Sequence, residues 1–166
     1  MAGKVIGKEM NMGYPGSYAR TPDCIIMNRV AATDVEFGLA VVLKSDNTYA
    51  AFGGSDTAAT FGGVAVREVK QATNFVDQNN VKYLQGDQMD ALERGNIVVK
   101  CQRGTPTAGG KVYVRKTANS TYPDAVVGGF EAAADSTNTV ELTNAYWTTG
   151  HKGAGDVAEI SIKFKA

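Results

Sequence analysis

The chain has 166 residues, which fits one domain or one domain with an arm. Its 17 Lys and Arg residues balance its 17 Asp and Glu residues, which argues against a nucleic-acid binder with a strong basic surface and against a polybasic membrane-surface protein. Hydrophobic residues make up 43% of the chain, enough for a core, and no apolar run reaches the roughly 18–20 residues of a membrane span.

The apolar composition favours β-strands. The chain has 18 Val and 6 Ile but only 5 Leu, together with 15 Thr. Val, Ile and Thr carry two heavy substituents on Cβ, which crowd a helical turn and suit a pleated strand. The 22 Ala residues would favour helices, but most of them lie beside Gly, Thr or Val. We therefore expect an all-β protein.

Residues 1–23 differ from the rest of the chain because no regular apolar period survives in them. The segment is rich in Gly and Pro and cannot build a core of its own, so it is either a frayed tail or an extended arm that another surface orders. Its Met and Tyr content favours the docking arm. The first residues also lack the apolar stretch of a signal peptide, so we expect no secretion by that route.

From residue 24 to residue 166 the pattern predicts a single β domain of short strands. We expect these strands at residues 24–30, 37–43, 48–52, 64–70, 97–101, 111–116, 126–133, 137–144 and 156–165. The Lys44–Asn47 cluster predicts a turn that joins the second and third strands in a hairpin. Residues 53–63 and 103–110 are predicted loops, and 71–80 is polar and turn-rich. Strands at this spacing, with no long helical pattern, predict a β-barrel or β-sandwich of short antiparallel strands.

Residues 86–95 allow two structures. One is a short helix with Asp87 at its N-terminus and Gly95 just past its C-terminus. The other is a strand in which Met89 and Ala91 share a face, followed by a turn at residues 93–96. The strong strand pattern that begins at Ile97 favours the second.

The reactive residue types suggest no catalytic or metal site. Cys24 and Cys101 lie 77 residues apart without metal-ligand spacing, and both border apolar runs, which favours buried reduced thiols over a disulfide. His151, the single His, lies in a glycine-rich stretch, which favours a loop residue over a member of a catalytic triad, and one His with two Cys offers too few ligands for a zinc site. The acids are scattered, many of them in turns. We expect no catalytic residue, no metal and no cofactor.

The pair Tyr146–Trp147 is a candidate platform for a sugar. Neighbouring residues on a strand point to opposite faces, so one of the two is expected in the core. A carbohydrate-binding module is therefore a weaker hypothesis that stays open.

Several short motifs follow one another in the order found in the capsid cement, or decoration, family of tailed bacteriophages. They are Phe37–Leu43, Phe61–Arg67, Tyr83–Asp87, Glu93–Lys100 and Gly109–Val114. They resemble that family's G-x-A-V-V strand, G-V-A-V strand, Y-x-x-G-D turn, G-x-I-x-V strand and G-x-x-V-Y-V strand. The Gly- and Pro-rich segment that ends in Arg20–Asp23 is also similar to the arms of small phage structural proteins. The resemblance covers roughly residues 15–116.

The resemblance implies a non-enzymatic virion protein, made in the host cytoplasm, on the outside of an icosahedral head. It would bridge neighbouring subunits of the major capsid protein, often as a homotrimer, without binding nucleic acid or membrane. We hypothesise that the arm contacts the capsid through Met10, Met12, Tyr14, Tyr18 and Arg20. The alternative functions are another virion β-protein, of the tail, baseplate or receptor-binding apparatus, or the carbohydrate-binding module.

Overall fold

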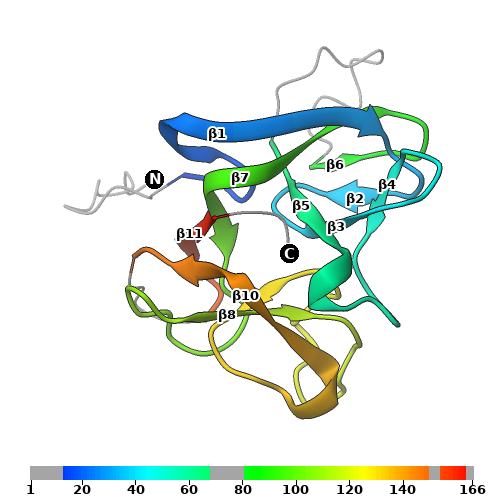
Figure 1. Ribbon diagram of the computed structural model, residues 1–166. Helices are drawn as coiled ribbons and strands as arrows, with labels where there is room; N and C mark the ends of the chain where they lie inside the picture. Colours follow the sequence, from blue (N-terminus) through cyan, green and yellow to red (C-terminus); the bar gives the residue numbers. More distant parts are fainter. Residues whose placement is uncertain (1–12, 68–80, 150–153, 164–166) are drawn as a thin grey trace, which may run out of the picture.

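The computed structural model describes residues 13–67, 81–149 and 154–163 (Figure 1). In these ranges the chain is almost entirely β, and most strands form one antiparallel sheet that curls into a half-barrel. The predicted fold class is confirmed. No helix in the described ranges is long and apolar enough to cross a membrane.

Eleven strands can be followed in the described residues. They are β1 (Tyr18–Val30), β2 (Val35–Glu36), β3 (Ala40–Leu43), β4 (Tyr49–Ala51), β5 (Phe61–Ala65), β6 (Lys82–Tyr83), β7 (Gln88–Lys100), β8 (Lys111–Arg115), β9 (Phe130–Glu131), β10 (Thr139–Trp147) and β11 (Val157–Ile162). Two single-turn 3₁₀ helices are η1 (Ala58–Thr60) and η3 (Ser136–Asn138). The main sheet has the order β4-β3-β5-β7-β11-β10-β8-β9, β1 adds to β7, and β2 pairs with β6 separately.

The long strand β7 organises the sheet. On one edge it pairs with β1 along most of its length, from Val30 opposite Gln88 to Tyr18 opposite Ile97. On the other edge its first half pairs with β5 and its second half with β11. In Figure 1, β1 and β7 run together across the upper part of the molecule. Each has 13 residues, so these two strands are longer than the short ones predicted.

The predicted turn at residues 93–96 is wrong, because β7 runs straight through it. The helical alternative for residues 86–95 is wrong for the same reason. Gly95 has φ of 118°, and a Cβ there would lie 2.5 Å from the carbonyl oxygen of Asp23. Gly95 therefore allows β1 to pass close to β7. The β1–β7 register shifts at this point, between Arg20 and Ile25.

Other predicted boundaries moved because neighbouring strands decide which residues pair. The predicted loop 53–63 contains η1 and the first residues of β5, which pair with β3 despite their two glycines. The strand predicted at 126–133 shortens to β9, whereas the one predicted at 24–30 begins earlier, at Tyr18. The hairpin across Lys44–Asn47 is confirmed as β3–β4. Residues 68–80 lie outside the described residues.

The buried hydrophobic side chains form a main core and a smaller cluster. The main core includes Phe52, Phe61, Leu92, Ile97, Trp147 and Ile160, and the smaller cluster includes Tyr49, Tyr83 and Met89. Trp147 is fully buried, and Tyr146 is partly exposed with Lys163 Nζ 4.8 Å from its ring centre. The expectation that one member of this aromatic pair belongs to the core is confirmed.

Apolar and polar residues alternate in the predicted strand 156–165, which predicts one buried face, and Ala158, Ile160 and Ile162 of β11 are all buried. The intervening Glu159 and Ser161 are nearly buried too, so the second face of this strand is covered as well. Both cysteines are free thiols, with Cys101 buried and Cys24 partly buried. Phe164 and His151 lie outside the described residues.

Candidate functional site

The segment just before β1 ties two distant parts of the sheet together. The amide of Gly16 donates to the Val98 carbonyl of β7 at 2.8 Å, and the Val98 amide donates to the Ser17 carbonyl at 3.0 Å. The Gly16 carbonyl accepts from the amide of Arg67, just after β5, at 2.7 Å. Residues 16–17 therefore connect β7 to the chain that follows β5. They also fix the position at which the N-terminal segment joins the sheet.

An aromatic stack lies beside this junction. The Arg67 guanidinium carbon is 4.7 Å from the Tyr14 ring centre and 5.9 Å from the Phe37 ring centre. Phe37 in turn packs edge-on against Tyr83, with ring centres 5.0 Å apart. Tyr14 remains 63% exposed, so the cation–π contact fixes an aromatic side chain on the surface.

The structure places only part of the predicted arm contact set. Tyr14 and Tyr18 are exposed, and Tyr18 is the first residue of β1. The backbone of Arg20 pairs with Asn96 within β1, but its side chain lies outside the described residues, as do Met10 and Met12. Contact of these five residues with a capsid stays a prediction, as does the division into an arm (1–23) and a body (24–166).

Strand β1 carries an apolar surface that sequence reasoning missed. Ile25 is 46% exposed and Met27 is 39% exposed, and both point to one side of the sheet because they are two residues apart. Ile26, between them, packs against the main core. The run Cys24–Met27 has the apolar character of a strand buried on both faces, so its composition concealed an exposed face.

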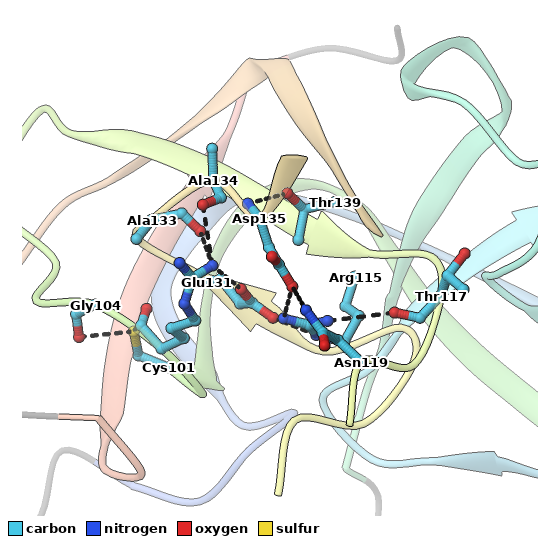
Figure 2. A network of polar contacts seen from close by, with 11 residues as sticks. Cys101, Gly104, Arg115, Thr117, Asn119, Glu131, Ala133, Ala134, Asp135 and Thr139 are labelled. Atoms are coloured by element: carbon cyan, nitrogen blue, oxygen red, sulfur yellow. Dashed lines mark hydrogen bonds and ion pairs between the residues drawn. The ribbon is translucent and has the colours of Figure 1, made fainter. Parts of the chain in front are cut away.

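A second feature is a buried ion network at β8 and β9, shown in Figure 2. Arg115 of β8 is fully buried, and its Nε donates to Glu131 Oε1 of β9 at 2.6 Å. Its Nη2 lies 2.9 Å from Asp135 Oδ2, and its Nη1 donates to the Thr117 carbonyl at 3.2 Å. Asn119 Nδ2 also donates to Asp135 Oδ2, at 2.9 Å.

Arg103 completes the network from the loop after β7. Its Nη1 lies 3.5 Å from Glu131 Oε2 and donates to the Ala134 carbonyl at 3.0 Å. Its guanidinium carbon is 4.3 Å from the ring centre of Tyr122. Two cations thus balance two carboxylates, and together they hold three loops against the β8–β9 pair.

The charge states of Arg115 and Asp135 give this network a structural role. Burial by itself lowers the pKa of Arg115, but the hydrogen bonds and charges of Glu131 and Asp135 outweigh it and raise the pKa above its usual value. The hydrogen bond from Asn119, assisted by Arg115, lowers the pKa of Asp135 despite some desolvation. Both groups stay charged at neutral pH, so the pair can exchange no proton there. The sequence analysis missed this cluster because each of its residues lies in a stretch whose composition is typical of a solvated strand or turn.

The described residues offer little for other chemistry. Burial raises the pKa of the Cys101 thiol, and its Sγ donates to the Arg103 carbonyl at 3.3 Å, so the thiol is held in its unreactive form. Within the described ranges, no three His, Cys, Asp or Glu side chains gather closely enough to hold a metal ion. The surface features suit adhesion: an anchored N-terminal junction and an exposed apolar strand.

Comparisons with known proteins agree with this interpretation. A family model described as "Structural cement protein (E217 gp24/Pam3 gp6)" matches residues 3–163. Among solved structures, the capsid of Myoviridae phage XM1 contains a similar chain, with a TM-score of 0.73, 16% identity and coverage of 100% of both chains. The head fibre gp8.5 N base of bacteriophage phi29 aligns with a TM-score of 0.45 and 11% identity, over 84% of this chain and 94% of that one. None of the curated proteins compared with the chain matches it.

Proposed function

The chain belongs to the phage structural cement protein family, and from this premise we propose that it binds the outside of an icosahedral head and joins neighbouring major capsid subunits. The observation that carries the proposal is a family match that extends through both the N-terminal segment and the sheet. The protein is a structural component of the virion capsid, which favours this reading over a tail protein, a receptor-binding protein or a carbohydrate-binding module. We propose no catalytic step for it.

The fold supports such a role because its strands resist deformation. A shell under internal pressure gains from an added protein that buries surface across subunit boundaries. Here β7 is hydrogen-bonded on both edges, and the Arg115–Glu131 pair fixes β8 to β9 from inside. Hydrogen bonds on both edges and a buried ion pair raise the free energy of local opening, which suits a protein that holds neighbouring subunits together.

The anchored junction supports contact through the N-terminal arm. The hydrogen bonds of Gly16 fix the junction before any partner binds, so the junction backbone loses little further freedom on capsid binding, which lowers the entropy cost. Met side chains adapt to irregular apolar surfaces, and Tyr adds a polar tip to an apolar ring. Met10, Met12, Tyr14, Tyr18 and Arg20 are the contacts that we propose.

We also propose a homotrimer, as the family resemblance implies. The balance of 17 basic and 17 acidic residues supports it, because copies without net charge can pack closely without long-range repulsion.

The test is binding of the purified full chain to heads that lack it, measured by co-sedimentation and by resistance of the heads to heat. We expect binding of the full chain and a large loss on deletion of residues 1–12. In the full-length arm, the pair Met10→Ser with Met12→Ser should weaken binding, whereas the pair Lys8→Ser with Asn11→Ser serves as the matched polar control.

Two outcomes separate the parts of this proposal. Undiminished binding of the truncated chain would remove residues 1–12, with Met10 and Met12, from the proposed contact. A full chain that does not bind heads would remove the cement function itself.

A further inference from the structure

Strand β1 has one hydrogen-bonded edge and one free edge among the described residues. β7 pairs with the first, and no described strand pairs with the second. The outer edge of such a strand presents a row of backbone donors and acceptors to any extended segment that reaches it. Ile25 and Met27 add exposed apolar side chains at the same place.

The sequence from Asp23 to Arg29 is complementary to itself. When the strand is laid antiparallel on a second copy with Ile26 opposite Ile26, Asp23 faces Arg29 and Ile25 faces Met27. The members of each facing pair are separated by an even number of positions, so both side chains lie on the same face of the joined sheet. Opposite charges therefore flank an apolar centre on both sides of a two-fold axis.

The charged residues at the two ends of this segment are Asp23, which is accessible to a partner, and Arg29, which lies close to the edge of β1. Asp23 has 74% of its side chain exposed and forms a surface ion pair with Arg94, itself 47% exposed, at 3.2 Å. Arg29 is partly buried, hydrogen-bonds to Asn47 and lies 5.6 Å from the Tyr49 ring centre. These contacts hold both charges near the strand, and the zero net charge of the chain adds no repulsion between copies.

We propose that β1 binds β1 of a second copy of this chain, in an antiparallel two-fold contact centred on Ile26. Such a contact is self-complementary, since each copy supplies the same surface. The inference deepens the proposed function, and rests on it only for its place in the virion, where the contact would link cement units bound to neighbouring capsid subunits.

The experiment uses charge reversal in the full chain, with self-association measured by analytical ultracentrifugation. Asp23→Arg places like charges opposite each other in both halves of the contact, and Arg29→Asp does the same. We expect each single reversal to weaken association about tenfold or more, and the double variant to restore it. The matched control is the double reversal of the exposed Lys111–Glu141 pair, which lies on β8 and β10, and it should leave association unchanged.

A second measurement locates the register. The double variant Ile25→Cys with Met27→Cys should form an intermolecular disulfide on mild oxidation, whereas Val126→Cys, on an exposed loop, should not.

A full chain that forms no assemblies with two-fold pairing overturns the proposal. So do single reversals without effect, or a double variant that does not recover, when the fluorescence of Trp147 shows a native core. Head binding by variants that no longer pair leaves the cement function intact, while paired protein that does not bind heads contradicts the cement function and not the β1 contact.

Discussion

Gly16 and Gly38 lie so close together that each fills the space where the other would carry a side chain. A Cβ on Gly16 would lie 3.0 Å from the amide nitrogen of Gly38, and a Cβ on Gly38 would lie 2.8 Å from that of Gly16. Both have left-handed backbones, with φ of 84° and 79°. The anchored junction of the N-terminal segment thus depends on two glycines from different parts of the chain.

We predict that Gly16→Ala detaches residues 13–17 from the sheet. The new methyl group would meet the amide of Arg67 at 2.7 Å in addition to the left-handed strain, so we expect a loss of about 2 kcal/mol or more in unfolding free energy. Denaturant titration and hydrogen exchange at Ser17 measure it. Gly109→Ala is the control, because Gly109 has φ of 78° but no atom within 4 Å of a built Cβ. Equal losses in both variants would show that the crossing contributes nothing.

Removing the buried cation of the ion network should destabilise the fold strongly. Arg115→Met leaves Glu131 buried without its main partner, which typically costs about 3–5 kcal/mol. Lys111→Met, on the same strand, removes an exposed partner of Glu141 and should have no measurable effect. Thermal unfolding of the two variants beside the parent chain makes the comparison. Similar melting temperatures for all three would contradict a structural role for the pair.

The same network should make stability depend on acid pH. The pKa of Asp135 is lowered from its usual 3.8, so the folded state binds fewer protons than the unfolded state in that range. Its contribution is complete above the unfolded pKa and is lost as pH falls through the folded pKa. Urea titrations from about pH 6 to about pH 2 measure the free energy of unfolding of the parent chain and of Asp135→Asn. The difference between the two free energies should become smaller as the pH falls. A difference that stays constant with pH would exclude this linkage.

The single tryptophan should report on the core rather than on a ligand. Trp147 is fully buried, so its emission should be blue-shifted in the folded state and insensitive to added glycans. Trp147→Ala should cost about 3–5 kcal/mol, and Tyr146→Ala much less, because Tyr146 is only partly covered. A soluble glycan that quenches the Trp147 fluorescence of the folded protein would support the sugar-binding hypothesis.

Several parts of the fold followed from local pattern. The β-branched composition predicted strands, the Lys44–Asn47 turn predicted the β3–β4 hairpin, and the alternation of β11 predicted its buried Ile160 and Ile162. Each of these depends on residues close together in sequence, whose backbone preference and side-chain spacing act directly.

Local sequence pattern predicted much less of the candidate sites. Tyr14 and Tyr18 were expected as contacts of a docking arm, which stays a prediction, and the apolar run of β1 gave no sign of an edge that no described strand pairs with. The exposure of Ile25 depends on what packs over that face of β1, and the position of β1 is set by its pairing with β7, which is far away in sequence. Local patterns carry no information about such pairing.

What the sequence by itself determined is the strand-forming character of the chain, its electrical neutrality and the family to which its ordered motifs point. The tertiary structure alone decided that residues 93–96 continue a strand, that Arg115 is buried beside Glu131, and that Gly16 rests on Gly38. Local composition expresses the preferences of single residues, whereas burial, charge pairing and close backbone crossings arise only when segments distant in sequence occupy the same space.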